Sequence, residues 1–171
     1  MLLANKKRKE NISEYLIYIY QTEDLLRAYG FDMADFKKKV IANLPEADRE
    51  EAFTWYKAIA AKMKEEGLET NGHLKETYTI VNDLVHLHEN LLKADQQYRQ
   101  LFSKSAMHIR NSINASEGKI DNPVQAALNG IYGYLLLKLT HKPIDPEILP
   151  AVHSFGDLLS YLSYRWHEKQ H

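Results

Sequence analysis

The most constraining feature of the sequence is an almost uncharged stretch at residues 122–139, where Lys138 is the only charged side chain. A helix over this stretch is apolar on nearly every side, which is typical of a helix inside a protein or a membrane. Gln125 and Asn129 make it too polar, and its length makes it too short, for the about 20 mostly apolar residues that span a bilayer. We therefore expect a buried central helix at about 123–140, with the other helices packed around it.

Composition predicts one ordinary globular domain at residues 1–171, since 44% of the chain is hydrophobic. The 22 Lys and Arg against 23 Asp and Glu give a formal net charge of -1, which lacks the basic excess of nucleic-acid-binding proteins. Two short basic runs, residues 6–9 and 37–39, are expected to be solvated helix faces. The chain has no cysteine, which excludes disulfides, thiol nucleophiles and Cys-ligated zinc. No signal peptide or membrane anchor is recognised, so we expect a cytoplasmic protein.

Hydrophobic periodicity and helix-ending residues predict an all-α fold, a single bundle of six to seven mostly antiparallel helices. Strand signals are nearly absent. Gly130 and Gly133, one helical turn apart, form a notch where a neighbouring helix can approach closely. Proline and glycine positions set the expected helices at 5–29, 33–43, 45–66, 72–115 with a break near 103–105, 122–139, and from 146 or 149 to the C-terminus.

Three short segments resemble a family of small, all-helical bacterial proteins known only as a domain of unknown function. They are RKENI at 8–12, QTEDLLR at 21–27 and IYGYLL at 131–136, and the resemblance extends over most of the chain. The resemblance implies an all-α fold and a bacterial cytoplasmic protein. It implies no activity, ligand or catalytic residue.

Several charged residues fall on the apolar faces of the expected helices, where chemistry in a helical protein is often found. Two interpretations are open. The residues could form one polar pocket between the helices at 5–29 and 72–115, in which a histidine moves protons and arginines hold an anion. Alternatively, they form structural ion pairs, Glu23 with Arg27 and Asp95 with Arg99, beside a histidine hydrogen-bonded between helices. The residues are Glu23, Arg27, His88, Asp95 and Arg99.

No metal site, cofactor or catalytic residue is predicted. Residues 168–171 supply the single Glu-x-x-His pattern, whereas a ferritin-like centre needs two on inward faces. His86 and Glu89 fall on the expected solvent face. Arg110 and Asn111 begin a pattern used by some helical ribonucleases, but Ala115 stands where the histidine is needed. An enzyme is therefore not the favoured interpretation.

Aromatic residues on the outer sides of helices suggest an interface instead. Tyr161 and Tyr164 are expected opposite the core stripe of the last helix, and Ile17 interrupts the polar side of the first. Exposed aromatic side chains are enriched in interfaces. The sequence therefore predicts a cytoplasmic interaction or assembly module that forms a homo-oligomer, a dimer, through its terminal helices. The alternative is a protein or enzyme that binds a small anionic molecule with the five charged residues above.

Overall fold

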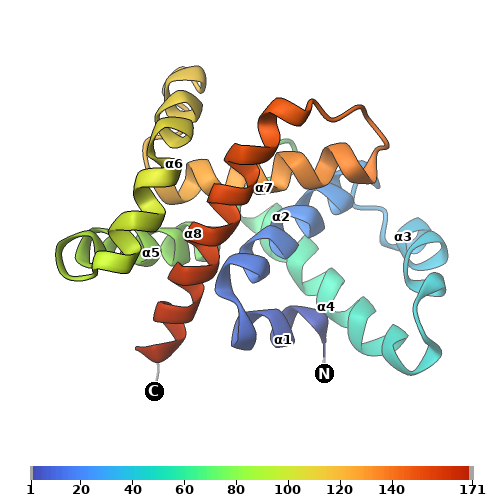
Figure 1. Ribbon diagram of the computed structural model, residues 1–171. Helices are drawn as coiled ribbons and strands as arrows, with labels where there is room; N and C mark the ends of the chain where they lie inside the picture. Colours follow the sequence, from blue (N-terminus) through green and yellow to red (C-terminus); the bar gives the residue numbers. More distant parts are fainter. Residues whose placement is uncertain (1, 170–171) are drawn as a thin grey trace. The chain divides into compact units, whose positions relative to one another are not determined.

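The computed structural model describes residues 2–169, which fold into α-helices without any β-strand (Figure 1). The all-α class is confirmed. Eight α-helices and two 3-10 helices lie within residues 2–169. They are α1 Leu3–Glu10, α2 Ile12–Ala28, α3 Met33–Lys39, η1 Ile41–Asn43, α4 Glu46–Glu65, α5 Lys75–Ala94, α6 Gln96–Ala115, α7 Pro123–Leu139, η2 Pro146–Ile148 and α8 Leu149–Glu168.

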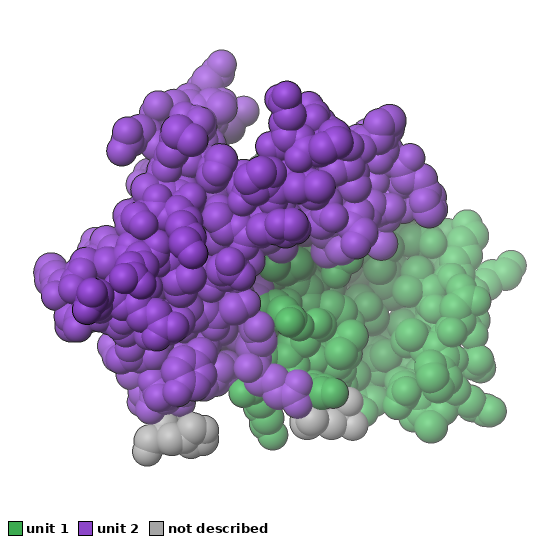
Figure 2. All heavy atoms as spheres, viewed as in Figure 1, with its two compact units in different colours: residues 1–9, 14–79 green, residues 10–13, 80–171 purple. Residues whose placement is uncertain are grey.

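The chain divides into two compact units, coloured separately in Figure 2. Unit 1 comprises Met1–Lys9 and Glu14–Thr79. Unit 2 comprises Glu10–Ser13 and Ile80–His171. The single domain expected from the sequence stays a prediction, and each unit is described by itself below.

A cluster of aromatic rings forms part of the core of unit 1. Phe36 of α3 is fully buried, with its ring centroid 5.4 Å from that of Tyr29 and 4.9 Å from that of Tyr56. Tyr18 of α2 stacks on Trp55 of α4 at 5.7 Å. Offset and edge-on ring pairs add to the hydrophobic gain from burial. These rings therefore connect α2, α3 and α4.

Unit 2 is built around the packing of α8 against α6 and α7 (Figure 1). Helical spacing predicts an inward stripe for the last helix, and four of its members are buried: Val152, Phe155, Leu159 and Leu162. Ser13, at the start of α2, lies against Ser163 of α8, whose hydroxyl accepts from the Ser13 N–H and donates to the Ser13 hydroxyl at 2.8 Å.

Helix α7 has the bounds predicted for the central helix, but it is buried only in its first half. Asn122 caps it through a hydrogen bond from the N–H of Gln125, and Pro123 occupies its first turn. Val124 to Leu128 contain all of its fully buried residues, whereas Leu136 and Leu139 are exposed. The expectation of a buried helix over 123–140 is therefore wrong for its second half, since apolar composition does not reveal whether another element covers a surface.

The long helix predicted after residue 71 breaks at Asp95, not near 103–105. Asp95 has an extended backbone conformation and accepts a hydrogen bond from the N–H of Tyr98, so it is the N-cap of α6. The first predicted helix also divides, at Asn11 between α1 and α2. This second break accounts for the helix beyond the six to seven expected.

The start of the last helix agrees with the sequence. Asp145 accepts a hydrogen bond from the N–H of Glu147, and residues 146–148 form the 3-10 helix η2. Helix α8 then begins at Leu149, so that Pro150 lies in its first turn, where a missing N–H does no harm.

Candidate functional site

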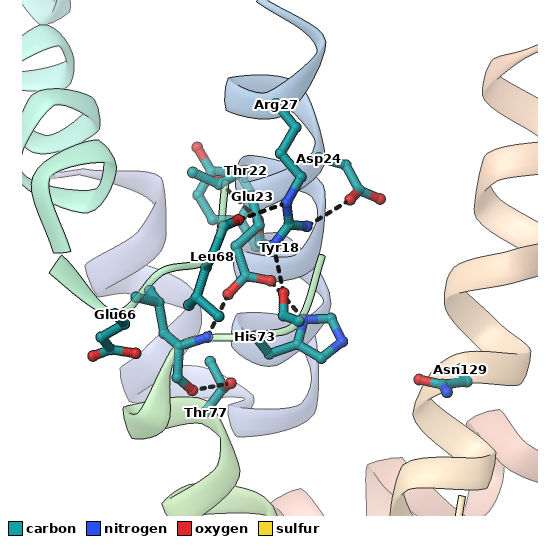
Figure 3. Close-up of polar contacts among 12 residues, drawn as sticks. Tyr18, Thr22, Glu23, Asp24, Arg27, Glu66, Leu68, His73, Thr77 and Asn129 are labelled. Atoms are coloured by element: carbon teal, nitrogen blue, oxygen red, sulfur yellow. Dashed lines mark hydrogen bonds and ion pairs between the residues drawn. The ribbon is translucent and has the colours of Figure 1, made fainter. Parts of the chain in front are cut away.

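Glu23 of α2 is a fully buried carboxylate in unit 1. Its Oε2 lies 2.6 Å from Nδ1 of His73, and its Oε1 accepts a hydrogen bond of 2.9 Å from the N–H of Leu74 (Figure 3). Leu74 directly precedes α5, and the His73 ring stacks on Tyr20 with centroids 3.9 Å apart. A buried carboxylate needs such partners whatever its function. Here they fix the chain where it enters α5.

Arg27 of α2 also binds the loop between α4 and α5, through two backbone carbonyl groups. Its Nε donates to the carbonyl of Leu68 at 3.0 Å, and its Nη2 donates to the carbonyl of Gly72 (Figure 3). Gly72 has a φ of +88°, a conformation that other residues rarely adopt. The third partner of the guanidinium is the carboxylate of Asp24 at 3.1 Å. The expected ion pair between Glu23 and Arg27 therefore does not form, because both side chains bind the loop between α4 and α5 instead.

His88 is buried between α5 and α6 in unit 2. Its Nδ1 lies 2.6 Å from the hydroxyl of Tyr98, and its ring meets that of Phe102 edge-on at 4.8 Å. Burial lowers the pKa of His88 and raises the pKa of Tyr98. A neutral imidazole and a neutral phenol therefore share this hydrogen bond. This is the histidine hydrogen-bonded between helices that the structural interpretation predicted.

Asp95 connects the corner between α5 and α6 to α8. Its Oδ1 caps α6, and its Oδ2 accepts hydrogen bonds from the Tyr161 hydroxyl at 2.8 Å and from the Arg165 guanidinium. The pKa of Asp95 is lowered, first by the hydrogen bond from the Tyr98 N–H, then by Tyr161 and by the charge of Arg165. The ion-pair partner of Asp95 is thus Arg165, and the expected pair with Arg99 is wrong.

Arg99 turns back toward the end of α5. Its Nη1 donates to the carbonyls of Leu92 and Lys93, at 3.2 and 3.3 Å. A cation at the last carbonyls of a helix satisfies acceptors that have no partner within the helix. Arg99 and Asp95 therefore stabilise the two helix ends that meet at this corner.

The structure distributes the five predicted site residues between the two units. Glu23 and Arg27 bind partners within unit 1, whereas His88, Asp95 and Arg99 bind partners within unit 2. A pocket shared by all five stays a prediction. Within the two units, Asp95 and Arg99 bind helix ends, Glu23 and Arg27 bind the loop between α4 and α5, and His88 is buried with a hydrogen-bond partner.

The three predicted interface residues differ in exposure. Tyr164 is 60% exposed, with its hydroxyl donating to Glu168 of the same helix at 2.9 Å. Tyr161 is half-buried and donates to Asp95, so its expected position on the outer side of the last helix is wrong. Ile17 is half-buried.

Two pockets in unit 1 were not expected from the sequence. One, of about 320 Å³, is lined by basic residues of α3 and α4 around Phe53. The lysines at 37–39 are exposed, as predicted, and the first two of them line this pocket. The other, of about 260 Å³, lies beside the rings of Tyr18, Trp55 and Tyr56. Arg49, Phe53 and Lys57 recur every four residues along α4. That spacing is the signal that could have indicated the basic pocket.

A family model described as "Domain of unknown function (DUF4924)" matches residues 1–171, the whole chain. The chain belongs to the DUF4924 family. No curated protein and no solved structure matches it. Membership of DUF4924 confirms the resemblance read from the three sequence segments, and it brings no activity with it.

Within residues 2–169, no three His, Asp or Glu side chains are grouped so that they could hold a metal ion. The Glu-x-x-His pattern at the C-terminus ends on His171, which lies outside the described residues. In the same part of the chain, no helix combines the length and the apolar character needed to cross a membrane.

Proposed function

We propose that this DUF4924 protein is an interaction module that forms a homodimer through the second half of α7. The proposal is supported by apolar residues of α7 that are exposed in the part of the chain that the structure describes. Leu136 is 37% exposed and Leu139 is 56% exposed. Gly133, Leu136 and Thr140 follow one another at three- and four-residue spacing, so they share one side of the helix, with Leu139 beside them.

The main support for the proposal is the position of Gly133 on an exposed side of α7. A glycine inside a helix costs about 1 kcal/mol relative to alanine. At Gly130 the cost has a structural reason, because a β-carbon there would lie 2.6 Å from the ring of Phe155. At Gly133 a β-carbon would meet nothing within 4 Å. An exposed glycine followed by exposed leucines one and two turns later fits the close approach of a helix from outside the chain.

A second copy of the chain is the partner that this surface fits most simply. Two α7 helices related by a twofold axis would each cover the other's leucines, and the two glycines would allow the backbones to approach. One helical stripe is smaller than the about 800 Å² per partner of a standard complex. We therefore expect a weak dimer, with a dissociation constant on the order of micromolar or higher.

Sedimentation velocity over a wide range of protein concentration tests the proposal. The wild type should shift from monomer to dimer as concentration rises, and Leu136→Glu should stay monomeric because it would bring two like charges into the contact. Met107→Glu is the matched control, since Met107 of α6 is 62% exposed and lies on another helix. A second comparison is Tyr164→Glu, which tests the α8 surface predicted from the sequence. A wild type that remains monomeric at millimolar concentration would refute the proposal.

A further inference from the structure

The basic pocket of unit 1 lies between α3–η1 and α4 and has a volume of about 320 Å³. Its apolar wall is made by Ile41, Ala42 and Phe53, and its charged rim by Lys37, Lys38, Arg49 and Glu50. We infer that this pocket binds a small aromatic molecule that carries a phosphate or carboxylate group. The inference is independent of the proposed dimer, whose surface lies on α7.

Arg49 is held in an orientation suited to an anion. Its Nε donates a hydrogen bond of 2.9 Å to the carbonyl of Leu44, at the end of η1. That bond uses one of the five N–H donors of the guanidinium and fixes the plane of the group. The terminal nitrogens remain for a ligand, and a guanidinium binds a carboxylate or phosphate in a bidentate manner.

The three lysines of α3 are all exposed, but their ion-pair partners differ. Lys39 forms an ion pair with Asp35 at 2.8 Å. Lys37 and Lys38 have no carboxylate partner within residues 2–169, and both line the pocket. The lining holds three basic side chains, Lys37, Lys38 and Arg49, and the acidic side chain of Glu50, so it has a formal excess of two positive charges. An anion in the pocket would offset this local repulsion.

Phe53 accounts for the aromatic part of the inferred ligand. The ammonium groups of Lys37 and Lys57 each lie 5.0 Å from the centroid of its ring. The ring is only half-buried, and it shares the pocket wall with the buried side chain of Ile41. A flat apolar group can cover this wall while its anion reaches Arg49 and Lys38. A volume near 300 Å³ is at the lower end of small-molecule sites, which excludes a large ligand.

Isothermal titration calorimetry at constant ionic strength tests the inference with phenyl phosphate and benzoate as probes. Saturable binding of either aryl anion is expected. Arg49→Gln and Lys38→Gln should each weaken it about tenfold or more, since each variant loses a charge-assisted hydrogen bond to the anion. Lys38→Gln is informative even if Arg49→Gln disturbs η1, because Lys38 is exposed and unpaired within residues 2–169. Lys62→Gln, the same charge change on an exposed residue of α4 outside the pocket, should bind as the wild type does.

Three results would overturn the inference. The first is the absence of saturable binding for both aryl anions. The second is equal weakening by Lys62→Gln, which would mean that the whole surface attracts anions without a site. The third is inorganic phosphate binding as tightly as phenyl phosphate, which would remove the role given to Phe53.

Discussion

The two glycines of α7 allow a prediction in which the same substitution has opposite effects one helical turn apart. Replacing glycine by alanine inside a helix raises the free energy of unfolding by about 0.5–1 kcal/mol, because the unfolded chain loses conformational freedom. At Gly133 nothing opposes this gain, since a β-carbon there has no neighbour within 4 Å. Gly133→Ala should therefore raise the free energy of unfolding by about 0.5–1 kcal/mol.

At Gly130 the new methyl group collides with a buried ring. Its carbon would lie 2.6 Å from both Cδ2 and Cε2 of Phe155, which is 2% exposed and has little room to move. Overpacking of this kind costs about 1–3 kcal/mol, which exceeds the gain in helix propensity. Gly130→Ala should therefore lower the free energy of unfolding by up to about 2 kcal/mol, or the melting temperature by several degrees.

Urea denaturation followed by circular dichroism measures both effects, at a concentration low enough for the protein to be monomeric. Combining Gly130→Ala with Phe155→Leu should recover part of the loss, because the smaller side chain removes the collision, and a double-mutant cycle would measure the coupling. If Gly130→Ala stabilises the protein as much as Gly133→Ala does, the close approach of α7 and α8 at this position is refuted.

Three further predictions concern the polar side chains of Glu23, His88 and Asp95. Glu23→Ala should lower the free energy of unfolding in urea by about 1–3 kcal/mol, because the buried N–H of Leu74 loses its acceptor. Glu69→Ala, an exposed carboxylate of the same loop, should change it by no more than about 0.5 kcal/mol, and equal effects would contradict the binding of this loop by Glu23. Burial lowers the pKa of His88, so the unfolded chain takes up this proton more readily, and wild-type stability should fall as pH drops below about 6.5. His88→Gln should reduce that loss between pH 7 and 5 in urea titrations, and an unchanged loss would show that His88 does not contribute. The pKa of Asp95 is lowered mainly by the backbone N–H group that it caps, so its contribution is present above about pH 4 and lost as pH falls further. Asp95→Asn should therefore flatten acid unfolding below pH 4, as followed by circular dichroism, whereas a wild-type profile would contradict this.

The helical class and several helix ends could be predicted because their causes are local. Asn122 and Asp145 cap helices at the positions expected, and Gly30 and Gly67 follow helix ends with positive φ. Each of these signals depends on residues within one turn of the helix end. Asp95 carried the same capping signal, but its place on an apolar face suggested a ligand site instead. The break in the long helix was therefore misplaced.

The partners of the charged residues could not be predicted because they are far away in sequence or belong to the backbone. Asp95 pairs with Arg165, 70 positions later, and Glu23 meets His73, 50 positions later. Arg27 binds carbonyl groups, which every residue has and no sequence pattern marks. Periodicity places a charge on a helix face, but it does not specify which element meets that face.

Disulfide cross-linking of single-cysteine variants tests self-association through α7 most directly, because the chain has no cysteine of its own. Two copies can be joined only where their Cα atoms come within about 4.4–6.8 Å of each other. Under mild oxidation, we predict covalent dimers of Gly133→Cys or Leu136→Cys whose yield falls on dilution. Met107→Cys, at a residue that is more exposed than Leu136 but lies on α6, should remain monomeric. No dimer from either α7 variant, or the same yield from Met107→Cys, would contradict the proposed role of this surface.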